Sequence, residues 1–247
     1  MALHFDYASA RAPTSSKRPA PTSTRGSSYT APLSLRFLYS FVELTSDGHI
    51  VVIHDDTVDR TTNGSGLVTS HTLADLRGLD AGSWFSAGFA GECIPLLDEV
   101  LARYKGRAHI HTEIKGYSPY LSQRTADLIH KHNMEQQVTI TSFQQVRLEE
   151  IQGYIPELPT GWLVVEVNEA IIEQARAMGL TQLCPRADTI TPKLVGRLHA
   201  EGFIVRAWGV ATEALMQQVV MAGADGMTVN FPDKLIAYLE RYKYQWE

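Results

Sequence analysis

Cysteine, long apolar runs and excess charge of either sign are all scarce in this sequence. Its 247 residues include two cysteines, Cys93 and Cys184, each in an apolar setting. Disulfide-stabilised proteins are far richer in cysteine, so we expect both residues to be reduced thiols in the core. No stretch of about 18 apolar residues occurs, and no membrane-spanning helix is therefore predicted.

The charge balance narrows the classes of partner. The formal net charge is −5, and nucleic-acid binding usually requires a basic face, so no nucleic-acid partner is expected. The N-terminus lacks a charged start followed by an apolar core and a cleavage site, which predicts no secretory signal and a cytoplasmic location. The sequence indicates no particular oligomeric state.

The N-terminal part has an unusual composition. Residues 8–31 are rich in Ser, Thr, Pro, Arg and Ala, and such a stretch has little to bury, so loop or disorder is predicted. Residues 3–7 alternate like a strand. Residues 33–41 are apolar enough for a strand or a short helix, and the pattern does not separate the two.

Strand and helix patterns alternate regularly after residue 108. Asn168 and Thr191 are typical residues at a helix start, and Gly179 and Gly202 at a helix end. The segments between strands carry apolar residues every three or four positions, the amphipathic helix period. Strands are predicted at residues 108–115, 137–141, 161–165, 181–184, 203–208 and 226–229.

Two earlier extended runs complete the strand pattern. Residues 42–44 and 50–53 flank an Asp-Gly turn, and residues 73–79 and 96–104 read as short helices. The two extended runs and the six later strands make eight predicted strands. Eight strands in a chain of about 250 residues are typical of an α/β fold of the (β/α)8, TIM-type barrel class. An open doubly wound sheet is the competing architecture.

One short strand ends in titratable side chains. Residues 51–66 read VVIHDDTVDRTTNGSG, so three apolar residues lead directly to His54 and a carboxylate pair. Strand ends that open into loops commonly carry the chemistry of α/β proteins, and Asp55 is placed to orient His54. The alternative for His54 is a hydrogen-bonded structural residue.

The strand at residues 108–115 has one polar face. His109, His111, Glu113 and Lys115 share this face, which we expect to point into the barrel with Glu113 and Lys115 nearest its open end. A carboxylate suits a hard cation such as Mg²⁺ or Ca²⁺, and an ammonium group neutralises a phosphate oxygen. A Glu–Lys salt bridge closing the barrel mouth is the alternative.

Several longer motifs resemble the glycerophosphodiester phosphodiesterase family. They are residues 51–66, HTLADLRGLDAGSWF at 71–85, IPLLDEVL at 94–101, EIKG at 113–116 and GADGMTVNFPD at 223–233. The resemblance implies a TIM-type barrel over residues 42–247, with a small insertion after the second strand at about 55–107.

The resemblance also implies an activity and a set of site residues. The activity is metal-assisted hydrolysis of a glycerophosphodiester to glycerol 3-phosphate and an alcohol, with Mg²⁺ or Ca²⁺ as cofactor. His54 matches a catalytic histidine, Glu113 a metal ligand, Lys115 the phosphate-binding lysine and Trp208 an aromatic residue of the pocket. Ser142, before Phe143, matches a family serine, or else it caps the next helix.

The resemblance stops before residue 42. The family's first strand ends in His-Arg-Gly, which is absent, and its Glu-x-Asp pair falls on Tyr39 and Phe41. Residues 1–41 are therefore interpreted as an atypical, partly disordered segment in place of the first strand and helix. A frameshift between about Ala8 and Phe41 is one hypothesis, which the other reading frames of the coding DNA would test.

These departures affect the predicted function. One carboxylate holds a hard cation poorly, and Glu43 is the nearest substitute, so hydrolysis is expected to be impaired. Loss of the first strand would also leave neighbouring strand edges unpaired. The alternatives are a non-catalytic phosphodiester- or partner-binding barrel, or a relative acting on lipid head groups.

Overall fold

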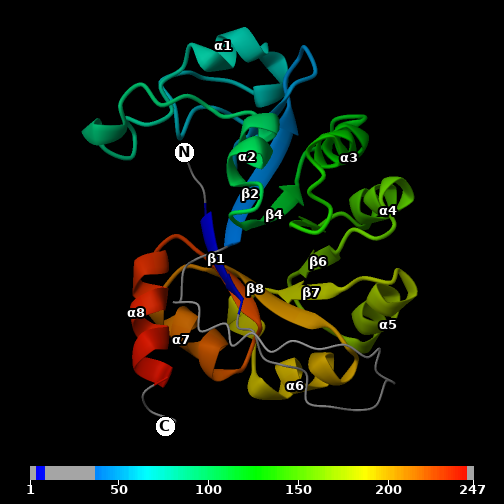
Figure 1. Ribbon diagram of the computed structural model, residues 1–247. Helices are drawn as coiled ribbons and strands as arrows, with labels where there is room; N and C mark the ends of the chain where they lie inside the picture. Colours follow the sequence, from blue (N-terminus) through cyan, green and yellow to red (C-terminus); the bar gives the residue numbers. More distant parts are fainter. Residues whose placement is uncertain (1–3, 9–36, 244–247) are drawn as a thin grey trace, which may run out of the picture.

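The protein folds as a ring of strands with helices on its outside. A computed structural model describes residues 4–8 and 37–243. Figure 1 shows helices α3 (Leu121–His132) to α8 (Pro232–Lys243) around the sheet, while the segment with α1 (Leu73–Arg77) lies at the top of the view. Residues 9–36, which include most of the predicted loop or disordered stretch, lie outside the described residues.

Among the described residues, eight of the nine strands form the ring, in the order β1-β9-β8-β7-β6-β5-β4-β2, and β1 pairs with β2 to close it. The strands from β2 round to β9 run parallel to their neighbours, whereas β1 is antiparallel to both β2 and β9. The ring strands are β1 (His4–Ala8), β2 (Phe37–Leu44), β4 (His109–Ile114), β5 (Val138–Ser142), β6 (Thr160–Val164), β7 (Gln182–Pro185), β8 (Ile204–Val210) and β9 (Gly226–Val229).

The pairing of β1 corrects an expectation from the sequence. Phe5 lies opposite both Leu38 of β2 and Val229 of β9, so β1 fills the place between them. The expected unpaired strand edges are therefore wrong for these residues. The apolar run that fitted either a strand or a helix is a strand from Phe37 onward.

The second early strand is not part of the ring. β3 (Ile50–Val52) turns back after β2 and pairs antiparallel with its upper half, where Leu44 faces Ile50. The eight strands predicted from the sequence included this one, so the count was right but one member was wrong. β1 pairs with Phe37–Tyr39 at the start of β2, and β3 pairs with Val42–Leu44 at its end.

Local signals set the helix boundaries. The side chains of Asn168, Thr191 and Thr212 each accept a hydrogen bond from the backbone N–H three residues later, a cap worth about 1 kcal/mol. Gly179 and Gly202 adopt positive φ beyond two helix ends, as predicted. The helices are α1 (Leu73–Arg77), α2 (Leu97–Tyr104), α3 (Leu121–His132), α4 (Gln145–Tyr154), α5 (Glu169–Ala177), α6 (Pro192–Ala200), α7 (Glu213–Met221) and α8 (Pro232–Lys243).

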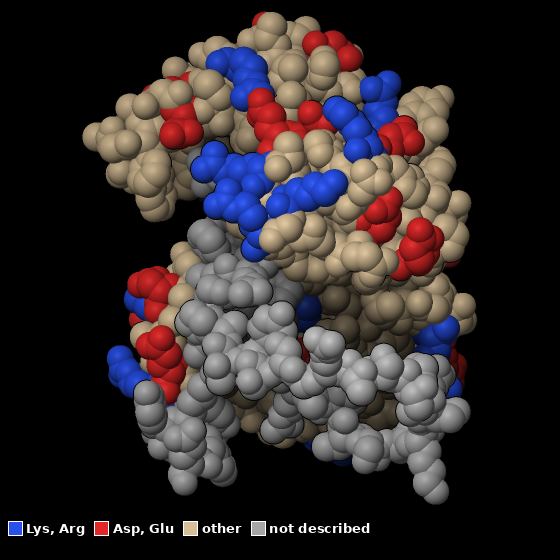
Figure 2. Space-filling view, in the orientation of Figure 1, with Lys and Arg blue, Asp and Glu red and all other residues tan. Residues whose placement is uncertain are grey.

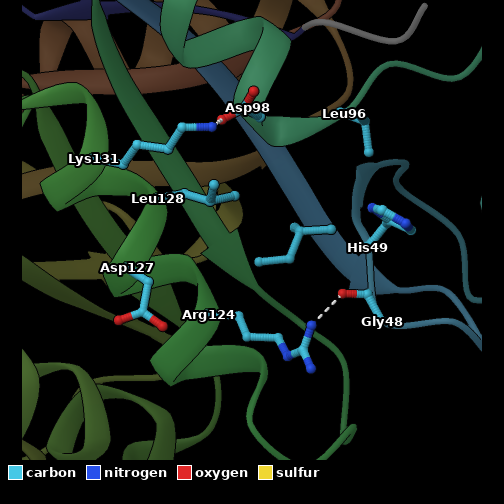
Figure 3. Close-up of a pocket in the computed structure, with 9 residues that line it drawn as sticks. Gly48, His49, Leu96, Asp98, Arg124, Asp127, Leu128 and Lys131 are labelled. Carbon is cyan, nitrogen blue, oxygen red and sulfur yellow. Dashed lines mark hydrogen bonds and ion pairs between the residues drawn. The ribbon is translucent and has the colours of Figure 1, made fainter.

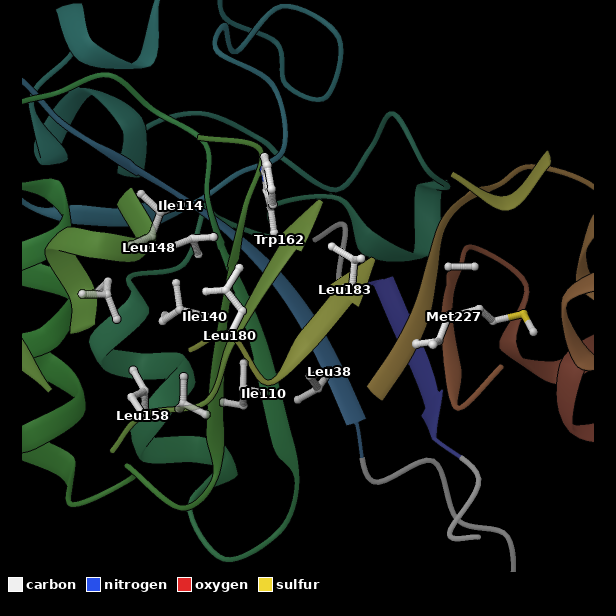
Figure 4. Close-up of a cluster of buried hydrophobic side chains, with 14 of the residues drawn as sticks. Leu38, Ile110, Ile114, Ile140, Leu148, Leu158, Trp162, Leu180, Leu183 and Met227 are labelled. Carbon is white, nitrogen blue, oxygen red and sulfur yellow. The ribbon is translucent and has the colours of Figure 1, made fainter. Parts of the chain in front are cut away.

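The main core lies between the ring and its helices. Ile110 and Ile114 are fully buried on the outer face of β4, as the alternation predicted. Figure 4 shows Ile114, Ile140 and Leu148 lying between strands and helices. Cys184 belongs to the buried interior, but Cys93 is only partly buried, so the prediction of two core thiols holds for one of them.

The inserted segment between β3 and β4 has its own small core. Val58, Val68, Leu76 and Ile94 of this segment are buried together with Val51 of β3, separately from the main cluster. Within residues 4–8 and 37–243, no helix is both long and apolar enough to cross a membrane. On the face shown in Figure 2, basic and acidic side chains lie close together over the upper part of the molecule.

Candidate active site

A cavity of about 380 Å³ opens at the carboxyl ends of the ring strands, the place where barrels of this kind keep their chemistry. All four residues singled out in the sequence line it. The complete lining is Tyr39, Phe41, His54, Glu113, Lys115, Phe143, Trp208, Gly209, Val210, Ala211, Thr228 and Asn230.

His54 reaches the cavity because β3 runs back toward the middle of β2. The N–H of Ile53 donates to the carbonyl of Phe41 at 3.0 Å, which fixes the chain beside that residue. The His54 ring then contacts the Phe41 ring edge-on, with centroids 4.3 Å apart. His54 therefore arrives on an antiparallel strand, not at the end of a parallel ring strand.

Asp55 holds the imidazole of His54. The Nδ1 atom of His54 lies 2.6 Å from Oδ1 of Asp55, whose two oxygens also accept from Arg60 at 2.5 and 2.9 Å. These bonds from Arg60, with a contribution from His54, lower the pKa of Asp55 to about 2 against the effect of burial. The ionised carboxylate favours the tautomer with hydrogen on Nδ1, so Nε2 is left as the acceptor.

Glu113 lies deep in the cavity and is 5% exposed. Its Oε2 atom accepts a hydrogen bond from the Tyr39 hydroxyl at 2.9 Å, and that hydroxyl also lies 2.9 Å from Oγ1 of Thr141. Burial raises the pKa of Glu113 to about 7, although Tyr39 and Lys115 oppose this. Burial and the charge of Glu113 also raise the pKa of Tyr39 well above 10, so the phenol stays neutral.

Lys115 lies at the rim, just beyond the end of β4. Its Nζ atom donates to the backbone carbonyl of His54 at 3.1 Å and lies 4.0 Å from the Asp56 carboxylate. The side chain is 37% exposed, so its ammonium group is accessible to a ligand. The alternative reading, a Glu113–Lys115 salt bridge across the mouth, is wrong, because Glu113 bonds to Tyr39 and Lys115 to the His54 carbonyl.

Two aromatic rings form the opposite wall. The Nε1 atom of Trp208 donates to the carbonyl of Val164 at 2.9 Å, and its ring meets Phe143 edge-on at 4.9 Å. The pairing of β8 with β9 shifts register just after Ala207, and Gly209 has φ of 72°, a conformation that favours glycine. This irregularity bends the strand at the position of the Trp208 ring.

Ser142 does not cap the next helix, so that alternative is wrong. Its hydroxyl donates to the carbonyl of Ile114 at 2.7 Å and accepts from the N–H of Gln144 at 3.1 Å. The residue before α4 is Gln144, and its side chain makes no capping hydrogen bond. Ser142 thus ties β5 to β4 and places Phe143 at the cavity.

A polar layer lies lower in the barrel. Nη1 of Arg206 donates to Nδ1 of His111 at 3.0 Å, and Nε2 of His109 lies 2.8 Å from the Thr139 hydroxyl. Burial, with help from His109, lowers the pKa of His111 well below its ordinary value, and burial lowers that of Arg206 to about 9. The polar face of β4 therefore points inward, as predicted.

A model of the glycerophosphoryl diester phosphodiesterase family matches residues 41–234. The chain belongs to this family. A glycerophosphodiester phosphodiesterase from Caldanaerobacter subterraneus subsp. tengcongensis is 36% identical over 199 residues, which cover 79% of this chain and 82% of that protein. One from Bacillus subtilis is 31% identical over 218 residues, covering 80% and 74% respectively. The predicted enzyme class, phosphoric diester hydrolase, is confirmed.

Solved structures of other phosphodiesterases share the barrel. A glycerophosphodiester phosphodiesterase from Agrobacterium tumefaciens has a TM-score of 0.70 at 24% identity and covers 82% of this chain and 87% of its own. An Oleispira antarctica phosphodiesterase in complex with the product sn-glycerol-3-phosphate has a TM-score of 0.74 at 25% identity, with 83% and 85% covered. The predicted TIM-type barrel is confirmed, and the open doubly wound sheet is wrong.

Members of the glycerophosphodiester phosphodiesterase family typically depend on a divalent metal ion, so we tested whether the side chains here fit one. One carboxylate oxygen of Glu113 already accepts a hydrogen bond from the Tyr39 hydroxyl. Glu43 does not line the cavity, because its Oε1 accepts from the N–H of Leu44 at 2.8 Å and from the Ser118 hydroxyl at 2.9 Å. Among the described residues, no three His, Cys, Asp or Glu side chains are grouped to hold a metal ion. The described side chains do not fit the expected Mg²⁺ or Ca²⁺.

A second groove of about 380 Å³ lies between the β2–β3 turn, α2 and α3. Figure 3 shows that two of its basic side chains are already bound: Arg124 donates to the Gly48 carbonyl at 2.6 Å and Lys131 to Asp98 at 2.6 Å. These bonds attach the turn and α2 to α3. These two basic side chains of the groove therefore hold neighbouring elements together.

Sequence reasoning missed part of the cavity wall. Tyr39 and Phe41 were recognised only as departures from the family pattern, not as lining residues. Thr228 and Asn230 lie at the end of β9 inside a motif that we used for the fold alone. Their position at the end of a predicted ring strand was the signal that could have identified them.

Proposed function

We propose that this chain binds a glycerophosphodiester in the cavity at the carboxyl end of the barrel, and that its hydrolysis to glycerol 3-phosphate and an alcohol is impaired. The observation behind the proposal is the meeting of His54, Glu113, Lys115 and Trp208 at one cavity. The Oleispira antarctica relative, whose structure holds sn-glycerol-3-phosphate, supports the choice of substrate class.

Each of these residues has a proposed part in binding or reaction. The Lys115 ammonium group neutralises a phosphate oxygen, and the Trp208 ring packs against the glycerol carbons. His54 moves a proton at a bridging oxygen through Nε2, since Nδ1 faces Asp55 at 2.6 Å. Water replaces the alcohol on phosphorus, and the departing alkoxide takes a proton.

The impairment follows from the site around Glu113. Hard divalent cations are held by about six to eight oxygen ligands, and the described part of the chain brings a single carboxylate to the cavity. The proposed reaction therefore has no step through a metal ion. The remaining chemistry is proton transfer by His54 and charge neutralisation by Lys115, which together supply only part of the family's catalysis.

Release of glycerol 3-phosphate from glycerophosphocholine and glycerophosphoethanolamine tests this function. The assay compares the chain with His54→Ala, with His71→Ala as a matched control because His71 is a surface histidine bonded to the Ser65 carbonyl. We expect slow release that disappears in His54→Ala and persists in His71→Ala. Equal rates in all three proteins would contradict the proposed site.

A non-catalytic barrel that binds phosphodiesters is the second candidate, and the neutral Tyr39 hydroxyl on Glu113 favours it. Saturable binding of glycerophosphocholine without any release of glycerol 3-phosphate would select this alternative. Release that depends on His54 would exclude it.

A further inference from the structure

Two aromatic residues stand where the family pattern has its Glu-x-Asp pair. Phe41 lies opposite Glu113 and Tyr39 opposite His111 across the β2–β4 pairing, and Tyr39 and Phe41 are 2% and 6% exposed. We propose that Tyr39 and Phe41 make this cavity a phosphodiester site that needs no divalent cation and prefers a monoanionic diester to a dianionic monoester. The inference rests on the proposed function, because it concerns the ligand of the same cavity.

The hydrogen bonds around Tyr39 have only one consistent direction. Its single hydroxyl proton goes to Oε2 of Glu113, so the hydroxyl of Thr141 must donate to the Tyr39 oxygen. Both bonds measure 2.9 Å and both are buried. A cation at this oxygen of Glu113 would have to displace the Tyr39 hydroxyl as a donor and break this buried chain of hydrogen bonds.

Phe41 closes the space beside this pair. Its ring centroid lies 4.9 Å from that of Tyr39 and 4.3 Å from that of His54. A benzyl ring offers no oxygen to a hard cation and excludes the water molecules that would complete its coordination shell. The ring therefore replaces a ligand position by apolar surface.

The other walls indicate the class of ligand. Phe143 and Trp208 give a second apolar surface, while Thr228 and Asn230 provide hydroxyl and amide groups. A cavity of about 380 Å³ is within the usual range for a small organic ligand. These walls fit a phosphate ester that carries a short polyol.

The charges that face the cavity set the preference between esters. Lys115 is the cation at the rim, and it stands 4.0 Å from Asp56, with Glu113 deeper in the cavity. A phosphodiester carries one negative charge, whereas a phosphomonoester carries about −1.5 to −2 at neutral pH. Among the described residues that line the cavity, Lys115 is the one Lys or Arg side chain, so the second charge of a monoester is left unbalanced near Asp56, and we expect the diester to bind about tenfold more tightly.

Equilibrium titration with glycerophosphocholine and with glycerol 3-phosphate tests the inference. Each ligand is titrated into the full-length chain in EDTA, in Mg²⁺ and in Ca²⁺, while phosphorus NMR of the same samples reports whether the diester stays intact. We expect the same diester affinity in all three buffers and about tenfold weaker binding of glycerol 3-phosphate. Diester binding that is at least about tenfold tighter with either metal would overturn the inference while the proposed function stands.

Two lysine variants show whether binding occurs in this cavity. Lys115→Ala should weaken diester binding about tenfold or more in EDTA. Lys131→Ala is the matched control, because Lys131 binds Asp98 in the other groove. Unchanged binding in Lys115→Ala would overturn the inference. No binding of either ligand in any buffer would overturn both the inference and the proposed function.

The double substitution Tyr39→Glu and Phe41→Asp tests the cause directly. It adds two carboxylates beside Glu113 in the register of β2, and we expect Mg²⁺ or Ca²⁺ to tighten binding of glycerol 3-phosphate about tenfold. Circular dichroism checks that the variant is folded. A folded variant that stays insensitive to both metals would contradict the assignment to these two residues. If the variant does not fold, the buffer comparison with the unsubstituted chain decides alone.

Discussion

Tyr39 is a buried residue of the candidate site whose hydroxyl joins three strands. Its hydroxyl joins Glu113 and Thr141 inside the barrel and ties β2 to β4 and β5. This contact therefore stabilises the fold as well as occupying one oxygen of Glu113. Buried polar groups are costly to leave unpaired, so this contact has a measurable effect on stability.

Substitution of Tyr39 by Phe should lower the free energy of unfolding by about 1–3 kcal/mol, because Glu113 and Thr141 each lose a buried partner. Urea denaturation measures the change. Tyr154→Phe serves as the control, since that side chain is 47% exposed. Equal stability of the Tyr39 and Tyr154 variants would show that the buried hydrogen bonds contribute nothing.

Asp55 should fix the tautomer of His54. Its carboxylate faces Nδ1 at 2.6 Å and is itself held by Arg60. We expect nitrogen NMR at neutral pH to show hydrogen on Nδ1 of His54, and Asp55→Ala to shift the signal toward the Nε2–H form. Asp59→Ala is the control, since Asp59 accepts from the N–H of Gly66 instead. The same tautomer in all three proteins would contradict a positioning role for Asp55.

The buried histidines give the stability a defined pH dependence. Burial lowers the pKa of His109, so the unfolded chain binds a proton near pH 6.5 where the native chain does not. Stability from this residue is therefore complete above about pH 6.5 and is lost as the pH falls below it, with a slope of up to about 1.4 kcal/mol per pH unit.

His109→Gln removes this titration and keeps a donor near Thr139. Between about pH 7 and pH 5, the free energy of unfolding should fall less steeply in the variant than in the unsubstituted chain. Denaturation at a series of pH values measures the two slopes. Parallel curves would mean that His109 binds its proton equally well in both states.

At the level of elements, the strands from β4 to β9 could be predicted closely, whereas β1 and β3 could be predicted as strands but not placed in the sheet. Each later strand is a short apolar run between amphipathic helices, so its limits are marked by composition, and β9 begins and ends where the sequence predicted. β3 has the same composition, but its sequence does not say whether it enters the ring. The antiparallel hairpin with β2 decides that, and β1 takes the eighth place.

Deletion of residues 1–8 tests the part that β1 plays. The strand pairs with β2 and β9 at once, so its loss opens two edges of the ring. We expect a lower melting temperature and a rise in light scattering on heating. If the melting temperature and the light scattering were both unchanged, the closing role of β1 would be contradicted.

Across the whole molecule, the sequence located the site better than it described its chemistry. His54, Glu113, Lys115 and Trp208 come from three distant segments, yet each lies in or just beyond the last part of a strand, and the barrel brings strand ends together. The bond from Tyr39 to Glu113 was not predictable, because Tyr39 lies in a stretch with no family motif and the contact spans 74 residues. Such contacts depend on register, and register came only with the structure.

The family, the barrel and the cavity together define the central claim, that a glycerophosphodiester phosphodiesterase barrel has here lost its cation site to Tyr39 and Phe41. Anomalous diffraction from crystals of the full chain soaked in Mn²⁺ tests it most directly. The account predicts no anomalous peak in the cavity and a Tyr39 hydroxyl still bonded to Glu113. A peak at about 2.0–2.6 Å from a carboxylate oxygen of Glu113, with further oxygen ligands around it, would contradict the account.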